Sequence, residues 1–280
     1  MPWEPHVVTD EVVVEAGPVK ALQALFDDGL PALGIGDPLP PLWHWVALAQ
    51  WAPSSAIAFD GHPHRGSFLP PVELPRRMFA GGRVSFRAPI AIGSTVRREQ
   101  EVTNVAEKDG RSGKLVIVDV ATRLFADGRL AVEETQSLVY RATGPGGGAH
   151  QGEDAVLAPT NTPLVRRGEW EWSLTTDPTL LMRFSAATSN AHRIHYDWPY
   201  ATQVEGYPGL VVHGPLMTLA LAEVVRLEAE AHISRLTHRN LAPLFCGTPA
   251  TIGRVPSDDG ATVQLVASDT PRTSLTYWVD

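Results

Sequence analysis

Cysteine, long apolar runs and an excess of positive charge are scarce or missing in this sequence. Cys246 is the single cysteine, so no disulfide can form within the chain. No helix start lies beside Cys246 to lower its pKa, which favours a small buried apolar residue over a nucleophile. No apolar run approaches the roughly 18 residues of a membrane-spanning helix. Met1–Asp10 is polar and lacks the apolar core of a secretory signal. We therefore expect a cytoplasmic protein with no membrane interaction.

The charge balance is acidic. The formal net charge is −8 at pH 7. A nucleic-acid-binding protein is expected to carry a basic face, so we predict no nucleic-acid partner. An acidic protein can still bind an anionic small molecule where arginines are concentrated.

The chain divides near its middle. Its 280 residues allow one large domain or two domains of about 140 residues each. The segment Gly144–Gly148 is made of glycine and proline, and the chain stays polar to Thr160. Such a composition predicts a flexible linker. We predict an N-terminal domain over 1–143, a linker over 144–160 and a C-terminal domain over 161–280.

The first half begins with helical patterns and ends with strands. The spacing of apolar residues predicts a helix over Pro18–Leu30, and Trp43–Trp51 is interpreted as a short helix. Residues 52–75 are rich in proline, glycine and histidine and are interpreted as a long loop. Asp-Gly pairs between apolar runs indicate hairpins. Strands are predicted over 76–88, 95–107, 114–126 and 130–141.

The second half repeats this plan. Asp177 is a plausible N-cap with Pro178 at the first helical position, and the helix extends to about Thr188. The three–four spacing of apolar residues predicts a second helix over Pro215–Leu227. Strands are predicted over 232–245, 248–256, 260–269 and 271–279. Helices followed by antiparallel strands indicate an α+β fold in which each sheet wraps around a central helix. Pairing the two sheets edge to edge would remove one exposed edge from each.

A short segment of the second half carries the chemistry. Asn190 precedes His195 by five residues, and Val211-Val212-His213-Gly214-Pro215 then opens the long helix. This layout resembles the active-site segment of the MaoC-like hydratases and dehydratases, which have a hot-dog fold. The resemblance implies a double hot-dog protein. Asn190 stands where most of that family has aspartate, and Ser189 and Arg193 replace a frequent glycine and proline.

Hydration of an enoyl thioester requires a held water, a group that exchanges protons and donors for the enolate oxygen. His195 suits proton exchange because an imidazole has a pKa near 6.5. Asn190 cannot act as a base, but its amide can orient the water. The unpaired N–H groups and the dipole at the helix that begins at Gly214 favour an oxyanion. We predict these three residues to be catalytic.

Other interpretations of the same residues remain open. Asn190 could cap a turn and His195 could be a core histidine. His192, His195 and His213 could form a metal site, but no acid completes a familiar ligand spacing, so no metal is predicted. His62 and His64 raise the same possibility, although a solvated loop is the preferred interpretation. The resemblance makes His213 a packing residue at the helix start, and we also group it with the residues expected to bind the substrate.

Segments of the first half indicate a particular branch of this family. The segments Asp60–Pro63, Gly66–Pro71 and Leu74–Arg83 are similar to the branch that contains the mesaconyl-CoA (3-methylfumaryl-CoA) and itaconyl-CoA hydratases. The C-terminal half is also similar to hydroxyacyl-thioester dehydratase type 2. The branch implies an acyl-CoA substrate with a free carboxylate, which an arginine would bind. Arg193 is the first candidate, and the alternatives are Arg65, Arg76 and Arg77.

The predicted protein is therefore a hydro-lyase that hydrates a short branched dicarboxylic acyl-CoA. The first half has no matching motif, so it is expected to shape the acyl tunnel, which Trp43, Trp45 and Trp51 could line. No cofactor is expected besides the coenzyme A of the substrate, and a homodimer or higher homo-oligomer is expected. The alternatives are a dehydratase of linear acyl chains, a thioesterase that would use Asp197, and a non-catalytic acyl-CoA-binding protein.

Overall fold

The structure is a computed structural model that describes residues 3–110, 113–142, 157–160, 162–229 and 232–279. Most of the linker predicted over 144–160 lies outside the described residues, and the domain boundaries remain a prediction. Within the described part of the chain, no helix combines the length and the apolar character needed to cross a membrane.

In the described part of the chain, all strands belong to one eleven-stranded antiparallel sheet. All eight predicted strands are present, although the strand predicted over 232–245 ends at Asn240. Three further strands, β1, β6 and β7, were not predicted. The first half supplies β1 (Val8–Val13), β2 (Arg76–Phe86), β3 (Thr95–Gly110), β4 (Gly113–Ala126) and β5 (Arg129–Arg141). The second half supplies β6 (Leu164–Gly168), β7 (Glu171–Leu174), β8 (Ile233–Asn240), β9 (Ala250–Val255), β10 (Ala261–Ala267) and β11 (Thr270–Val279).

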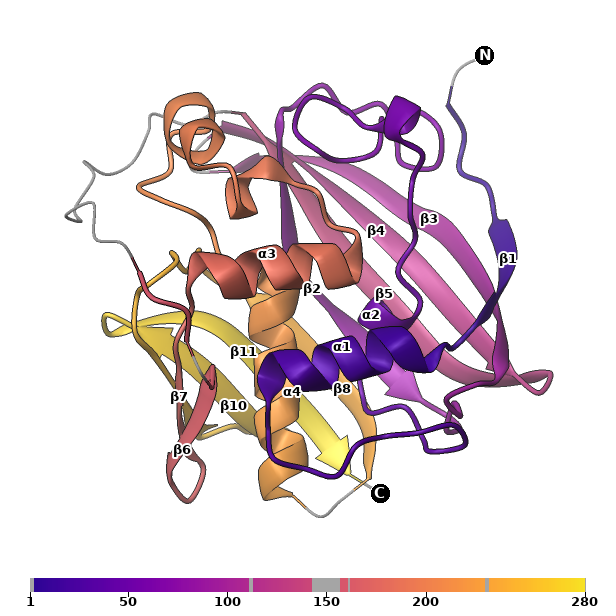
Figure 1. Cartoon of the computed structure of the whole chain (residues 1–280). Helices are drawn as coiled ribbons and strands as arrows, with labels where there is room; N and C mark the ends of the chain where they lie inside the picture. The colour runs from indigo at the N-terminus through magenta and orange to yellow at the C-terminus, as the bar shows by residue number, and fades with distance from the viewer. Residues whose placement is uncertain (1–2, 111–112, 143–156, 161, 230–231, 280) are drawn as a thin grey trace.

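The two halves join edge to edge through β2 and β8. The strand order is β1-β3-β4-β5-β2-β8-β11-β10-β9-β7-β6, so each half occupies its own side of the sheet (Figure 1). Gly82 pairs with His238 across the junction. A Cβ at Gly81 would lie 2.4 Å from the carbonyl oxygen of His238, and one at Gly82 would lie 2.3 Å from that of Thr135. Glycine therefore allows β2 to approach β8 at the seam between the halves and β5 within the first half.

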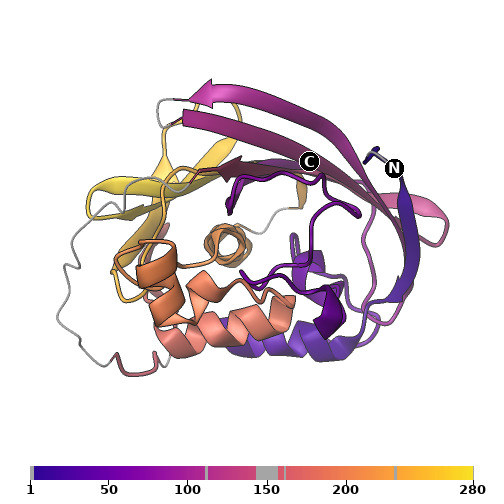
Figure 2. The same cartoon turned by 90° about the horizontal axis from the view of Figure 1, so that it is seen from above.

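Helix α4 (Gly214–Glu228) is the buried helix of the molecule. Seen end-on, it lies between the sheet and a layer formed by α1 (Ala16–Phe26) and α3 (Pro178–Thr188) (Figure 2). Its side chains from Leu216 to Val225 are all buried, as expected for a helix that is apolar all round. Each large buried apolar side chain contributes about 1.5–3 kcal/mol. This burial holds the start of α4 rigidly against the sheet.

The two helices of the first half are shorter than predicted, whereas α3 has the predicted bounds. Helix α1 ends at Phe26 rather than Leu30, and only His44–Ala47 (α2) is α-helical within 43–51. The remaining helical turns are η1 (Ser54–Ala56), η2 (Arg193–His195) and the π-helical η3 (Tyr200–Val204). The predicted loop over 52–75 contains only η1.

Helix α3 has defined ends, and its C-terminal end sets the position of Asn190. The Oδ1 atom of Asp177 accepts hydrogen bonds from the backbone of Thr179 at 2.7 Å and of Leu180 at 3.1 Å. The predicted N-cap is thus confirmed. At the other end Ser189 adopts a left-handed conformation with φ of 52° and terminates the helix. Asn190 follows directly, so its position is set by the end of α3.

Candidate functional site

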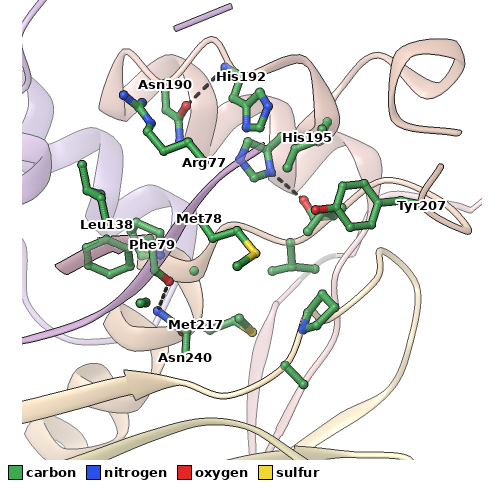
Figure 3. A pocket seen from close by; sticks show the side chains of 18 of the residues that line it. Arg77, Met78, Phe79, Leu138, Asn190, His192, His195, Tyr207, Met217 and Asn240 are labelled. Atoms are coloured by element: carbon green, nitrogen blue, oxygen red, sulfur yellow. Dashed lines mark hydrogen bonds between the residues drawn. The ribbon is translucent and has the colours of Figure 1, made fainter. Parts of the chain in front are cut away.

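A cavity of about 390 Å³ lies where the two halves meet. Its walls come from β2, from the start of α4, from the loop after α3 and from the segment after β8 (Figure 3). Asn190, His195 and Gly214 all line this cavity. The structure therefore brings the three residues predicted to be catalytic around one space, while β2 and β5 of the first half form the opposite wall.

His195 is held in one tautomer. Its Nδ1 atom lies 2.7 Å from the carbonyl oxygen of Val211 (Figure 3). Because a carbonyl only accepts, Nδ1 carries the proton and Nε2 keeps a free lone pair. Burial lowers the pKa of His195 to about 3, the nearby His192 lowers it too, and the Val211 carbonyl opposes the shift. The ring is therefore neutral near pH 7 and able to accept a proton.

His213 supports His195 from behind rather than contacting a ligand. The two rings stack with centroids 3.6 Å apart and an interplanar angle of 19°. The Nε2 atom of His213 lies 2.8 Å from the Oγ of Ser185, and burial holds the pKa of His213 well below its usual value. His213 is fully buried and does not line the cavity. The predicted substrate contact of His213 is therefore replaced by packing, because the ring of His195 stands between it and the cavity.

Asn190 is oriented by its own loop. Its Oδ1 atom accepts a hydrogen bond from the backbone N–H of His192 at 3.2 Å, and its backbone N–H donates to the carbonyl of Ser185 at 2.9 Å. Within the described residues, the side-chain NH₂ group makes no hydrogen bond. Since the residue lines the cavity, these two N–H donors are available to a bound water.

Gly214 places the amino end of α4 against the cavity. In any helix the first N–H groups lack an intrahelical acceptor, and Pro215 has no N–H of its own. A Cβ at Gly214 would lie 3.0 Å from Nδ2 of Asn240 and 3.3 Å from a ring carbon of Phe79. Glycine thus lets these side chains close around the helix start. The backbone N–H of Gly214 and the helix dipole can stabilise a negatively charged oxygen.

The loop over 52–75 is less exposed than predicted. His62 is buried and lines the cavity, whereas the sequence favoured a solvated loop. Its Nδ1 atom lies 3.1 Å from a carboxylate oxygen of Asp60, and its ring lies 4.2 Å from that of His192. His192 in turn lies 3.0 Å from an oxygen of Glu205. Two histidine–carboxylate pairs therefore stand side by side at the cavity wall.

The histidines are not arranged as either of the two metal sites considered from the sequence would require. His195 and His213 are stacked face to face, so their nitrogen atoms do not converge on one point. Asp60, His62 and His192 instead bring one ligand atom each to within 4.8 Å of one another. Both imidazoles of this group already have a carboxylate partner, which accounts for their arrangement. The expectation that the protein uses no metal stays a prediction.

Arg193 does not reach the cavity. Its Nε donates to Asp197 at 2.8 Å and its Nη1 to the Phe59 carbonyl at 3.2 Å. The guanidinium also lies 4.4 Å from the ring centre of Tyr200. The sequence singled out Arg193 as the first candidate for a substrate carboxylate. The structure corrects this choice, because the ion pair with Asp197 occupies the guanidinium away from the cavity.

Arg76 and Arg77 are adjacent on β2, but they differ in whether they line the cavity. Arg76 is buried, donates to the backbone carbonyl of Glu205 and lies 3.9 Å from its carboxylate. It does not line the cavity. Arg77 lines the cavity beside Asn190 (Figure 3). Of the arginines that the sequence offered, Arg77 is the one at the cavity wall.

Several cavity residues were not predicted. They are contributed by segments far apart in the chain, namely Met78, Phe79 and Leu138 of the first half and Tyr207, Met217 and Asn240 of the second. Asn240 donates to the carbonyl of Phe79 at 3.1 Å and so ties β8 to β2 at the cavity (Figure 3). No local motif marks these residues, because they meet only through the pairing of the two halves.

Three expectations about single side chains can be compared with the structure. Trp43 is buried in the core and Trp51 is 75% exposed, so only Trp45 lines a cavity. Asp197 is bound to Arg193 and accepts from the backbone of Tyr200 at 3.2 Å. Burial raises the pKa of Cys246 to about 12, which leaves it protonated and a poor nucleophile.

A second cavity of about 250 Å³ adjoins the first at Phe79, Asn190 and Pro215. Its wall contains the buried carboxylate of Glu134, which accepts from His44 at 3.0 Å, Trp45 at 2.8 Å and Gln136 at 2.9 Å. Burial alone would raise the pKa of Glu134, but His44 and the other donors hold it below its usual value. This chamber therefore carries an ionised group, and further polar residues line it: Arg98, Gln100 and Thr122.

The sequence is similar to proteins of one family. Residues 42–246 match the family described as hydroxyacyl-thioester dehydratase type 2. The mesaconyl-C(4)-CoA hydratase of Chloroflexus aurantiacus is 44% identical over 232 residues, which are 83% of this chain and 80% of that protein. The mitochondrial hydroxyacyl-thioester dehydratase type 2 of Schizosaccharomyces pombe is 27% identical over 257 residues, covering 84% of this chain and 85% of that protein.

Solved structures share the fold. HtdX of Mycobacterium tuberculosis superposes with a TM-score of 0.64 at 19% identity, covering 97% of this chain and 99% of that one. Another Mycobacterium tuberculosis protein, described as a double hot-dog fold, superposes with a TM-score of 0.54 at 17% identity over 100% of this chain and 96% of its own. The predicted α+β double hot-dog fold is confirmed.

Proposed function

Because the chain belongs to the hydroxyacyl-thioester dehydratase type 2 family, we propose that it is a hydro-lyase that reversibly adds water to an enoyl-CoA. The proposed substrate is a branched C5 dicarboxylic acyl-CoA, either mesaconyl-CoA (3-methylfumaryl-CoA) or itaconyl-CoA, which gives a citramalyl-type product. The 44% identity to a mesaconyl-C(4)-CoA hydratase supports this choice. Coenzyme A enters as part of the substrate, and no separate cofactor is proposed.

The proposed mechanism uses one base and two sets of N–H donors. The Asn190 amide holds a water over the β-carbon, and Nε2 of His195 takes a proton from it as the oxygen attacks. In mesaconyl-CoA, whose double bond is conjugated with the thioester, the electrons of that bond move to the thioester oxygen, where the Gly214 N–H stabilises the enolate. The imidazolium then returns the proton to the α-carbon, so that one water is added. Loss of one oxyanion donor costs roughly 3 kcal/mol in comparable sites.

The hydrogen bond between His195 and Val211 is the observation on which the proposal depends most. It leaves the unprotonated nitrogen of a neutral imidazole at the wall of the cavity. General-base catalysis by such a group contributes typically about 10²–10⁴-fold.

A dehydratase of linear acyl chains is the second candidate, since the family and the yeast relative are both named as hydroxyacyl-thioester dehydratases. A long alkyl chain passing Asn190 would enter the second cavity, which contains ionised Glu134. Burying a charge beside alkyl groups is costly, so the polar chamber favours a short polar acyl group. A thioesterase is disfavoured because Asp197 is bound to Arg193.

A spectrophotometric screen tests the proposal by following loss of the enoyl-thioester absorbance. Mesaconyl-C4-CoA, itaconyl-CoA, crotonyl-CoA and a long linear enoyl-CoA are compared with the enzyme before and after treatment with a chelator. We expect the dicarboxylic substrates to give the highest kcat/KM, and chelation to have no effect. Faster turnover of the long linear chain would establish the second candidate. Binding without turnover of any substrate would indicate a non-catalytic acyl-CoA-binding protein.

A further inference from the structure

We propose that Arg77 binds the carboxylate of the acyl group and so selects dicarboxylic substrates, an inference that rests on the proposed function. Arg77 lies on β2, at the wall of the main cavity. Its side chain extends beside Asn190, on the same side of the cavity as the amide proposed to hold the water (Figure 3).

Arg77 lacks the carboxylate partner that the neighbouring Arg65 and Arg76 have. Arg76 faces the carboxylate of Glu205, and Arg65 lies 3.9 Å from Asp60 while donating to three backbone carbonyls. Among the residues that the structure describes, no carboxylate lies within the 4.0 Å of an ion pair from the Arg77 guanidinium. Asp60 acts on Arg77 only at longer range and is already bound to His62.

Arg77 is half-buried, and the polar group beside its guanidinium is the hydroxyl of Tyr140 rather than a carboxylate. Burial lowers the pKa of Arg77 and is the largest cause of that shift, although an arginine remains protonated. Its charge also helps to hold the pKa of His62 well below the usual value. A buried charge is costly unless a counter-charge compensates it. A carboxylate brought by the ligand would supply that counter-charge.

The position of Arg77 fits the chemistry of the proposed substrate. In 3-methylfumaryl-CoA the carboxylate is attached to the β-carbon, which is the carbon that water attacks. The carboxylate must therefore lie close to the water-holding Asn190 amide, and Arg77 lies there (Figure 3). A guanidinium can bind a carboxylate through two parallel hydrogen bonds, which fixes the orientation of the acyl group.

Arg141 is the competing cation at the cavity wall. It lies at the end of β5 and interacts with Tyr207, a residue that appears on the other side of His195 from Arg77 (Figure 3). Arg141 is therefore compared directly with Arg77 in the experiment.

The experiment measures the Kd of succinyl-CoA and of butyryl-CoA, which differ by a terminal carboxylate and cannot be hydrated. The wild-type protein should bind succinyl-CoA at least about tenfold more tightly than butyryl-CoA, as expected for a charge-assisted pair. R77Q should remove this preference by weakening succinyl-CoA alone. R141Q and the matched control R193Q should keep it.

Two results would overturn the role of Arg77: a wild-type protein without preference for succinyl-CoA, or an R77Q protein that retains it. Should R77Q fail to fold, R77K should weaken succinyl-CoA binding several-fold and leave butyryl-CoA binding unchanged, because lysine cannot form the two parallel bonds. Unchanged succinyl-CoA affinity in R77K would contradict the proposal. A preserved preference without hydration of any enoyl-CoA would instead reject the proposed function alone.

Discussion

At the scale of single residues, His195 differs from an ordinary histidine in its hydrogen bond and its burial. Val211 fixes the proton on Nδ1, and the ring of His213 covers one face. A solvated imidazole is half protonated near pH 6.5, whereas the pKa of His195 is lowered to about 3. His195 is therefore a base that stays neutral over the whole physiological range.

The pH dependence of kcat/KM follows from this state. The proposed mechanism requires neutral His195, and the neutral form predominates above a pKa of about 3. We expect kcat/KM to stay level from about pH 8 to about pH 5 and to fall only at lower pH, with the slope of a single proton. Initial rates at each pH, with the enzyme returned to pH 7.5 afterwards to check recovery, provide the measurement. A midpoint near 6.5 would show that the imidazole is not buried as described.

The sequence could predict the local part of the site but not the part assembled over distance. Asn190, His195 and Gly214 occupy one short stretch, so their order along the chain carries a signal. His62 and Asn240 reach the cavity from other segments, and nothing beside them in the chain reveals it. Arg193 was chosen because it lies in the same short stretch as Asn190 and His195. That choice was wrong because the side chain of Arg193 forms an ion pair with Asp197 instead of reaching the cavity.

At the scale of elements, the loop before β2 holds the segment Asn190–His195 in place. The N–H of Arg193 donates to the carbonyl of Asp60 at 3.0 Å. Gly61 adopts a φ of +91°, and a Cβ there would lie 1.8 Å from the carbonyl oxygen of Ala191. The first half thus contacts the Asn190–His195 segment backbone to backbone, and only glycine allows it.

Substitution of Gly61 by alanine should damage the site without changing a residue that is proposed to be catalytic. The new methyl group must displace the backbone at Ala191, and an alanine at positive φ is strained. We expect G61A to lower the free energy of unfolding by about 1–3 kcal/mol and kcat by at least about tenfold. Urea unfolding and steady-state kinetics measure both.

Gly17 provides the matched control, because it lies in α1 and a Cβ there would meet nothing within 4 Å. G17A should be neutral or stabilising by a few tenths of a kcal/mol, about as expected for an exposed helix position. Equal free energies of unfolding and equal kcat values for G61A and G17A would contradict the proposed role of the contact between Gly61 and Ala191.

Secondary structure followed from the sequence where turns were well marked. Strands β3, β4 and β5 are bounded by Asp-Gly pairs or nearby glycines and were predicted closely. Strand β1 and the pair β6 and β7 are short and lie at the two ends of the sheet. These strands have only 6, 5 and 4 residues, which is too short for the alternation of apolar and polar residues to be recognised in the sequence.

At the scale of the whole molecule, the seam between β2 and β8 creates both the continuous sheet and the cavity. The predicted edge-to-edge pairing of two sheets is present. The oligomeric state and the cytoplasmic location remain predictions. Burial of several neutral histidines near the seam gives the folded state a characteristic dependence on pH.

Stability should fall as the pH drops below about 6.5. Burial lowers the pKa of His195 to about 3, that of His238 to about 4 and that of His213 well below its usual value. Their contribution is complete above the unfolded pKa and is lost below it, because only the unfolded chain takes up protons there. Each group contributes about 1 kcal/mol per pH unit.

Glu223 opposes this trend, since burial raises its pKa to about 7 and the folded state then binds one extra proton. The contribution of this one group to the pH dependence of stability is smaller than the opposite contribution of the three histidines. Urea unfolding at about pH 7.5, 6 and 5 should therefore give a steadily decreasing free energy of unfolding. A constant or increasing value over that range would contradict the neutral, buried state of the histidines.

The most direct measurement compares hydration of mesaconyl-C4-CoA by the wild-type protein, by H195A and by H64A, whose histidine is exposed and outside the cavity. The proposed mechanism predicts that kcat falls by about 10²–10⁴-fold in H195A, while H64A matches the wild type and the Kd of succinyl-CoA changes little in either variant. Undiminished turnover by a folded H195A protein would contradict the role of the imidazole.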